Sequence, residues 1–186
     1  MIVCAGNNET FSFATPIGVG LIESTINLTR IALFDKPDFL IFIGSAGSYG
    51  EAKIFDIVES AIGANIELSF WEKNSYTPID NVIEATRYKN NVSHETKNDV
   101  IVNSSNYITT NSQLSKNYLK HNIHLENMEF FALMRVAQEF DIPVLGIFVV
   151  TNYTDKDAHK DFLTNHSKAK ELLTKYMHNR YQELKK

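Results

Sequence analysis

The sequence has almost no cysteine, the residue that stabilises many secreted proteins through disulfide bonds. It contains one cysteine, Cys4, among 186 residues. A single thiol excludes an internal disulfide framework and fits a reducing cytoplasm. Because Cys4 lies in the apolar segment Ile2–Ala5, we expect a buried core residue rather than a nucleophile.

The chain also lacks an excess of positive charge, with 18 Lys and Arg against 22 Asp and Glu and a net charge of −4. Nothing resembles a basic nucleic-acid footprint, a signal peptide or a membrane-spanning apolar run. The six histidines are not spaced as metal ligands with cysteines or carboxylates. We therefore expect a cytoplasmic globular protein that binds neither nucleic acid nor membrane nor metal.

What the chain does have is an alternation of apolar and helix-forming segments over its whole length. The continuous apolar runs at 39–43 and 144–150 are typical of strands covered on both faces. Strands alternating with helices predict an α/β three-layer fold, in one domain spanning 1–186, with a mostly parallel or mixed sheet. Residues 72–99 carry no clear assignment. The predicted strands are 2–5, 39–43, 56–62, 65–70, 100–102 and 144–150, and the predicted helices are 21–34, 128–140 and 155–181.

Two glycine-containing segments are candidate ligand loops. Gly18-Val19-Gly20 precedes a predicted helix and could offer backbone N–H groups to an anion. It lacks the third glycine of a dinucleotide fingerprint, so a plain turn is the simpler interpretation. Gly44-Ser45-Ala46-Gly47 follows a buried strand, and we interpret it as a tight loop whose Ser45 hydroxyl and amides could contact a small ligand.

Glu129 and Asn152 are far apart in sequence but are expected at one edge of the sheet. Glu129 begins a predicted helix, where a carboxylate either stabilises the helix dipole or contacts a ligand. Asn152 ends a predicted strand, where it is either a turn residue or a ligand-binding amide. Ligands usually bind outside the carboxyl ends of strands in open α/β sheets.

Four segments, taken in order, resemble the purine nucleoside phosphorylase and methylthioadenosine/S-adenosylhomocysteine nucleosidase family. The resemblance begins near Thr15, covers most of the chain, and implies a three-layer α/β/α sandwich with a mixed central sheet in a homo-oligomer. The four segments are Gly18–Gly20, Phe39–Gly47 with Asp56-Ile57-Val58, Asn106-Tyr107-Ile108, and Met128-Glu129 with Thr151–Asp155.

The resemblance assigns roles to these positions. Met128 and Glu129 would hold the ribose, with Glu129 accepting hydrogen bonds from sugar hydroxyls. Tyr107 would stack on the purine and the Ile108 backbone would touch its edge. Asn152 would face N7 and the 6-substituent, which makes Glu129 and Asn152 the implied catalytic pair.

The resemblance also implies a site for phosphate or the attacking water. Ser45, with the Gly18 to Gly20 turn, would lie there. Phe162 would match an aromatic residue that closes a site in the family's oligomers. Glu9 is a candidate for the early catalytic carboxylate of the nucleosidases.

Three departures from the family pattern affect the expected reaction. Asn152 stands where the nucleosidases and hexameric phosphorylases have Asp, and an amide cannot transfer a proton. The trimeric, 6-oxopurine-specific phosphorylases have Thr-Asn there, which favours inosine or guanosine. Phe42 replaces a phosphate-binding arginine, for which only Arg87 is a candidate substitute. The N-terminal region is also short before the Gly18 to Gly20 turn.

The resulting prediction is a purine nucleoside phosphorylase that cleaves 6-oxopurine (deoxy)ribonucleosides in nucleoside salvage. Inorganic phosphate would be its co-substrate, and no other cofactor is expected. The alternatives are a purine nucleosidase that uses water, or a catalytically weak relative that binds nucleosides or a partner.

Overall fold

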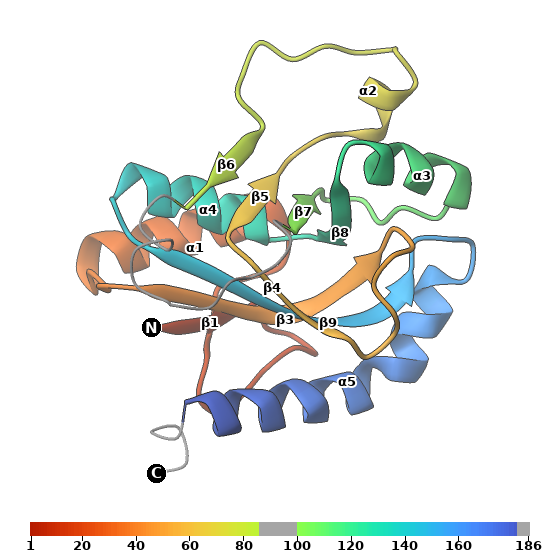
Figure 1. The fold of residues 1–186 in the computed structure, drawn as a ribbon. Helices are drawn as coiled ribbons and strands as arrows, with labels where there is room; N and C mark the ends of the chain where they lie inside the picture. The colour runs from red at the N-terminus through yellow and green to blue at the C-terminus, as the bar shows by residue number, and fades with distance from the viewer. Residues whose placement is uncertain (86–99, 182–186) are drawn as a thin grey trace.

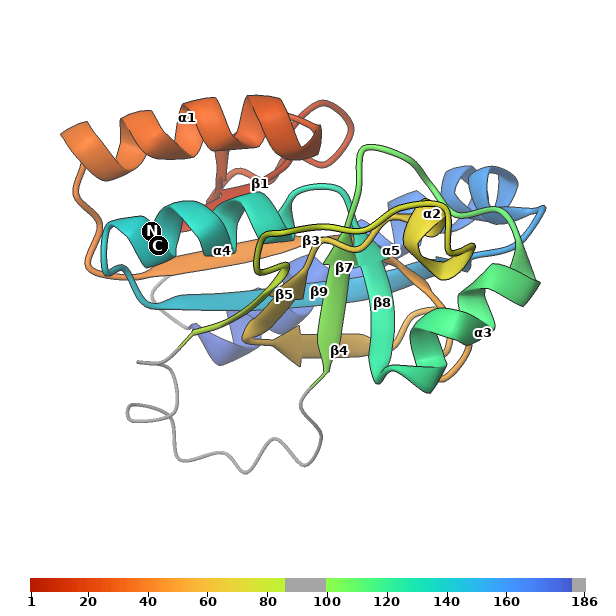
Figure 2. The ribbon, with the colours of Figure 1, turned by 90° about the horizontal axis from the view of Figure 1, so that it is seen from above.

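The computed structural model describes residues 1–85 and 100–181 and shows three layers (Figure 1). A twisted mixed sheet lies in the middle. Helices α1 (Gly20–Phe34) and α4 (Phe130–Glu139) cover one face, and α5 (Ala158–Arg180) covers the other. Seen from above, α1 and α4 run side by side (Figure 2). The predicted α/β fold with a mixed central sheet is confirmed.

The sheet has the strand order β2-β1-β3-β8-β7-β5-β6, and β9 pairs with β3 and β4. Strand β3 runs parallel to β1 and β9 but antiparallel to β8, which makes the sheet mixed. The strands are β1 (Ile2–Cys4), β2 (Thr15–Pro16), β3 (Leu40–Ser48), β4 (Ile57–Ser60), β5 (Ile62–Ala64), β6 (Val82–Glu84), β7 (Ile101–Ser104), β8 (Ile123–Asn127) and β9 (Val144–Tyr153).

The central pair, β3 and β9, is longer than predicted. The segment 44–48 is not a tight loop but the second half of β3, with a register shift between Ala46 and Gly47. The loop prediction was wrong because these small residues provide close packing rather than a turn. A Cβ atom at Gly44 would lie 2.9 Å from the ring of Phe42, and one at Gly47 would lie 3.1 Å from Nδ2 of Asn152.

Other differences concern the polar half of the chain. Residues 65–70 do not form a strand, since α2 (Leu68–Trp71) occupies part of this segment. Helix α3 (Ser112–Lys120) and strand β8 were not predicted. Asn111 caps α3 by accepting hydrogen bonds from the next turn. Residues 5–19, between β1 and α1, contain no helix, as the short connection in the sequence implied.

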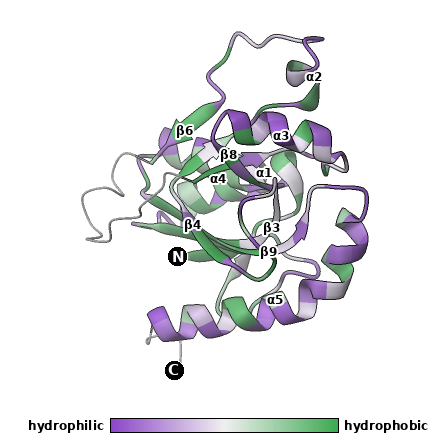
Figure 3. Cartoon of the chain, turned by 45° about the vertical axis from the view of Figure 1, so that its right-hand side comes forward, coloured by the Kyte–Doolittle hydropathy of each residue, from purple (hydrophilic) through white to green (hydrophobic). Residues whose placement is uncertain are grey.

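Two apolar cores lie on the two faces of the sheet. The rings of Phe42, Phe130 and Phe148 pack together between the sheet and α4. On the other face Cys4 lies in the core under α5, so the prediction of a buried thiol is confirmed. Burying each large apolar side chain contributes about 1.5–3 kcal/mol. Figure 3 shows hydrophobic residues along the central strands and hydrophilic residues on the outside of α5.

In the part of the chain that the structure describes, no helix is long and apolar enough to cross a membrane.

Candidate active site

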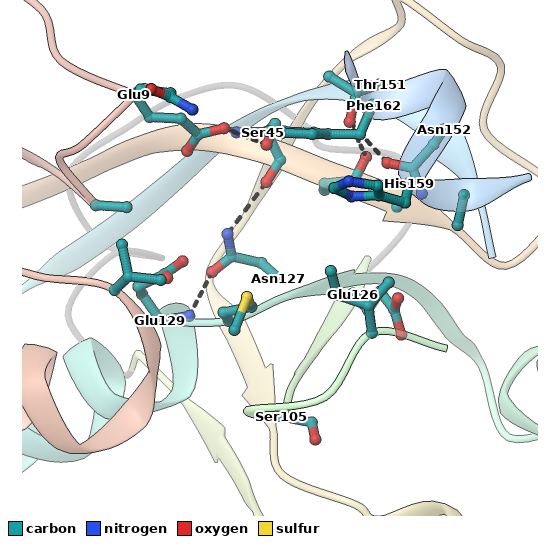
Figure 4. A pocket seen from close by; sticks show the side chains of 18 of the residues that line it. Glu9, Ser45, Ser105, Glu126, Asn127, Glu129, Thr151, Asn152, His159 and Phe162 are labelled. Carbon is teal, nitrogen blue, oxygen red and sulfur yellow. Dashed lines mark hydrogen bonds between the residues drawn. The ribbon is translucent and has the colours of Figure 1, made fainter. Parts of the chain in front are cut away.

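A cavity of about 300 Å³ opens at the carboxyl ends of β3 and β9 (Figure 4). A cavity of this size can hold a small organic ligand. Its walls come from the β1–β2 loop, β3, the segment after β7, the β8–α4 junction, β9 and the start of α5. The predicted site residues that line it are Glu9, Ser45, Tyr107, Ile108, Met128, Glu129, Asn152 and Phe162.

Gly18 and Gly20, predicted at a phosphate or water site, do not line this cavity. The N–H group of Gly20 donates to Glu129 Oε1 at 2.9 Å, and that of Val19 donates to Glu23 Oε2 at 3.0 Å. Gly20 has a φ of +82°, a conformation that favours glycine. The turn therefore orients Glu129 and does not present free donors to an anion.

Glu129 lies at the junction of β8 and α4. It is the N-cap residue of α4, but the capping interaction comes from Asn127, whose Oδ1 accepts from the N–H groups of Glu129 and Phe130 at 2.8 and 2.9 Å. Asn127 also donates through Nδ2 to the Ser45 carbonyl at 3.1 Å. The Asn127 side chain thus caps α4 and links the first turn of this helix to β3. The Glu129 side chain is directed to the cavity (Figure 4).

Glu129 is only 3% exposed. Burial raises its pKa from 4.5 to about 7. The hydrogen bond from Gly20 lowers this pKa, and the charge of Glu9 raises it. Glu129 therefore changes protonation state near neutral pH.

Glu9 and Ser45 form a second acidic feature of the cavity. The Glu9 carboxylate accepts a hydrogen bond from the Ser45 hydroxyl and a second one from the Ser45 N–H at 3.2 Å. Burial raises the pKa of Glu9, while the Ser45 hydroxyl lowers it. A carboxyl group made more basic in this way is suited to accept a proton.

The opposite part of the cavity is formed by Tyr107, Ile108 and Glu126. Tyr107 is 82% exposed and Ile108 is 50% exposed, so the cavity is open on this side. Glu126 Oε1 accepts from the N–H of Thr109 at 3.0 Å, and Oε2 accepts from the Tyr49 hydroxyl at 3.1 Å. Burial raises the pKa of Glu126 to about 7, and both hydrogen bonds lower it.

Glu126 was not among the predicted site residues because β8 was not recognised. The signal was present: Ile123, Leu125 and Asn127 are buried in alternation with two partly buried residues. This period of two is typical of a strand. The polar residues in the segment concealed it.

Asn152 has a fixed side-chain amide. Its Oδ1 accepts from the Thr151 hydroxyl at 2.8 Å, and its Nδ2 donates to the Tyr153 carbonyl at 3.0 Å. The amide is 6% exposed and lines the cavity together with Glu129. The second N–H of Nδ2 is available to a ligand.

The charge around the cavity is one-sided. Among the described residues that line it, three are carboxylic acids and none is Lys or Arg. Phe42 is buried in the core, and Arg87 lies outside the described residues. Within 1–85 and 100–181, no three His, Cys, Asp or Glu side chains gather as metal ligands.

This sandwich has carboxyl and amide groups around a cavity at the strand ends, which is where α/β proteins with open sheets usually bind their ligands. A model of the Phosphorylase superfamily matches residues 90–179. The predicted resemblance to this superfamily is thereby confirmed over residues 90–179. No curated protein matches this sequence.

Solved structures share the fold over nearly the entire chain. The futalosine hydrolase of Helicobacter pylori strain 26695 is 16% identical, with a TM-score of 0.82 over 98% of this chain and 96% of that one. A mutant of the Helicobacter pylori MTAN with 5'-methylthioadenosine is 18% identical, with a TM-score of 0.75 over 91% and 79%. The 5'-methylthioadenosine/S-adenosylhomocysteine nucleosidase of S. pneumoniae is 15% identical, with a TM-score of 0.72 over 94% of each chain.

Proposed function

We propose that this protein is a purine nucleosidase, which uses water to cleave the N-glycosidic bond of a purine nucleoside. The observation that carries the proposal is the acidic cavity. Glu9, Glu126 and Glu129 line it, and none of its described lining residues is Lys or Arg. A phosphate dianion would meet like charges there without a compensating cation, whereas a neutral water molecule would not. Water is therefore the better nucleophile for this site than phosphate.

Glu9 is the proposed general base. Its carboxylate, held by Ser45, would accept a proton from the water as the water oxygen forms a bond to C1′ of the sugar. The bond between C1′ and N9 of the purine breaks, and its electron pair leaves with the base. The products are the free sugar and a purine anion. This anion takes up a proton from the solvent at the open side of the cavity, and Glu9 releases to solvent the proton that it accepted from the water.

Glu129 is the proposed sugar-binding carboxylate, with Met128 beside it in the cavity wall. The sugar becomes oxocarbenium-like in the transition state, so a nearby carboxylate stabilises its positive charge. The Gly20 N–H fixes one oxygen of Glu129, and the remaining lone pairs of the carboxylate would accept from sugar hydroxyls. This interaction would strengthen as charge develops on the sugar.

The purine would lie at the open side of the cavity. Tyr107 would stack on its face, and Asn152 would donate its free N–H to the base, where negative charge develops during departure. An amide stabilises this charge but cannot protonate the leaving group. Phe162, from α5, would cover the remaining apolar wall.

The solved structures of similar fold support hydrolysis over phosphorolysis, because they are described as a futalosine hydrolase and as nucleosidases. Phosphorolysis is the second candidate function. The candidate phosphate-binding arginine, Arg87, lies outside the described residues, so the described cavity wall does not include it. The homo-oligomer expected from the family resemblance stays a prediction.

The test measures release of free purine from inosine, guanosine, adenosine, 5'-methylthioadenosine and futalosine, each with and without inorganic phosphate. We expect release without phosphate and no acceleration on its addition. Release only with phosphate would replace the nucleosidase by a phosphorylase. No release from any substrate, with nucleoside binding that does not change in Glu129→Ala, would refute the catalytic interpretation.

A matched control is Glu139→Ala. Glu139 is exposed at the last residue of α4 and does not line the cavity. We expect it to retain wild-type activity, while Glu129→Ala on the other end of the same helix loses it.

A further inference from the structure

Helix α5 contacts the turn of the β1–β2 loop that carries Glu9. The Nε2 atom of His166, on α5, lies 2.9 Å from the carbonyl oxygen of Asn8, the residue before Glu9. We propose that His166 is a positioning residue, which donates this hydrogen bond and thereby holds Glu9 where it can accept a proton from the water. This inference rests on the proposed function and adds to it a residue from outside the cavity wall.

The peptide group between Asn8 and Glu9 is held from both sides. Its N–H donates to the Gly6 carbonyl at 2.9 Å, which closes a turn. Its carbonyl oxygen lies 2.9 Å from His166 Nε2. Because a peptide group is planar, these two contacts fix the orientation of the plane from which the Glu9 side chain extends. Ser45 holds the other end of this side chain at the carboxylate.

The turn itself is exposed and polar. Asn7 and Asn8 are both exposed, and Asn7 has a φ of +52°, a conformation that is uncommon for residues other than glycine. Exposed loop tips with few buried apolar contacts open more easily than the core of a protein. The position of Glu9 therefore depends on the hydrogen bonds of the turn, and the contact with His166 connects the turn to a long helix.

The direction of this hydrogen bond follows from its acceptor. A carbonyl oxygen only accepts, so His166 Nε2 carries the hydrogen. The Phe162 ring packs against the imidazole with a centroid distance of 5.0 Å, and it lines the cavity. These two residues are one helical turn apart and share a side of α5. The imidazole thus lies between an aromatic residue of the cavity wall and the turn that carries Glu9.

The same side of α5 also acts on Glu9 through charge. Burial raises the pKa of Glu9, while the Ser45 hydroxyl and the charges of His166 and Lys170 lower it. The Lys170 Nζ atom lies 5.5 Å from the centre of the Phe11 ring, in the same loop. Neither His166 nor Lys170 lines the cavity. Their influence on the reacting water must therefore pass through Glu9.

The main test compares kcat and KM for purine release in the wild type, His166→Leu and His166→Gln, with the nucleoside that the wild type cleaves fastest. Leu keeps an apolar contact for Phe162 but has no donor, whereas Gln supplies an amide N–H. We expect kcat to fall about 3- to 10-fold in His166→Leu, the loss of one hydrogen bond, with KM unchanged. In His166→Gln kcat should return close to the wild-type value. An equal fall in both variants, or a change in KM alone, would overturn the proposal.

A double variant shows whether His166 acts through Glu9. In the Glu9→Gln protein no base remains to be positioned, so the addition of His166→Leu should leave kcat unchanged. Two residues that act independently would instead have additive effects. A further fall in the double variant would show that His166 supports the fold in general and would overturn the proposal. A wild-type kcat in Glu9→Gln itself would refute the proposed base instead.

His178→Leu is the matched control. His178 is a second histidine of α5 that contacts the same loop, through the Phe13 ring at a centroid distance of 5.2 Å. This contact lies outside the turn from Gly6 to Glu9. We expect wild-type kcat and KM in His178→Leu. A fall in kcat equal to that in His166→Leu would assign the effect to packing between the helix and the loop and would overturn the proposal.

Amide hydrogen exchange, measured by NMR, tests the contact without the cleavage reaction. The Glu9 N–H closes the turn, so it should exchange about 3- to 10-fold faster in His166→Leu than in the wild type and in His166→Gln. An unchanged exchange rate would refute the positioning role and leave the proposed nucleosidase activity intact. Faster exchange in a protein that cleaves no nucleoside would support the positioning of Glu9 by His166 and refute the proposed function.

Discussion

The two ends of the cavity each contain a buried carboxyl group with a pKa raised to about 7, yet their surroundings differ. Glu129 is held by the Gly20 N–H and lies near a second carboxyl group, Glu9, whose charge raises its pKa further. Glu126 is held by Thr109 and Tyr49, and no neighbouring charge raises its pKa. Desolvation thus raises the pKa of both carboxyl groups to about 7, while their hydrogen-bond partners determine what each group can do.

The ends also differ in exposure. Glu129 is 3% exposed, whereas Tyr107 is 82% exposed. The Glu129 end is enclosed by hydrogen-bonded groups, and the Tyr107 end is open to solvent. We therefore expect substitutions at the enclosed end to alter kcat and substitutions at the open end to alter KM.

The largest effect is expected for Glu9→Gln, which removes the proposed base but keeps an oxygen that can accept from Ser45. General-base catalysis typically contributes about 10²- to 10⁴-fold, so kcat should fall by about that factor with little change in KM. Steady-state release of free purine measures both constants. A kcat within about 3-fold of the wild-type value is far less than general-base catalysis contributes. This result would exclude Glu9 as the base and would contradict the proposed difference between the two ends of the cavity.

A smaller effect is expected for Tyr107→Ala at the open end. Stacking of one base on an aromatic ring contributes about 1–3 kcal/mol, and the exposure of Tyr107 places it at the lower limit, so KM should rise about 5-fold. Tyr107→Phe should restore the wild-type KM because it keeps the ring. A fall in kcat without a change in KM would contradict the proposed division between the ends.

The smallest effect concerns the stability of the ligand-free protein. The pKa of Glu129 rises from 4.5 to about 7 on folding, so the folded state binds this proton more tightly than the unfolded state. The resulting stabilisation is fully present below pH 4.5 and is lost as the pH rises through about 7. Tm should therefore be higher at pH 5.5 than at pH 8.

In Glu129→Gln this difference in Tm between the two pH values should shrink by about 4–8 °C, with Glu139→Gln as the control. Scanning calorimetry at both pH values measures it. A pH dependence that is the same in Glu129→Gln and in the wild type would show that the Glu129 proton does not contribute.

The apolar half of the fold could be predicted from local patterns. The runs at 39–43 and 144–150 predicted the central strands because residues covered on both faces must all be apolar. The helix at 128–140 followed from its apolar spacing. Strand β8 was missed because polar residues alternate with its apolar ones, and α2 was missed because its 4 residues are too few to show a helical period. The pattern at 44–48 was misread because Gly47 packs against Asn152, which is far away in the chain.

The sequence by itself determined the layered α/β class and the convergence of Glu129 and Asn152, because strands of this pattern place their carboxyl ends along one edge. Only the tertiary structure decided what these residues do there. The Gly20 N–H that orients Glu129 is 109 residues away in the chain. The Thr109 and Tyr49 groups that hold Glu126 come from two further segments. The orientation of each carboxyl group depends on these hydrogen-bond donors. A local sequence pattern does not reveal them, because they come from distant segments of the chain.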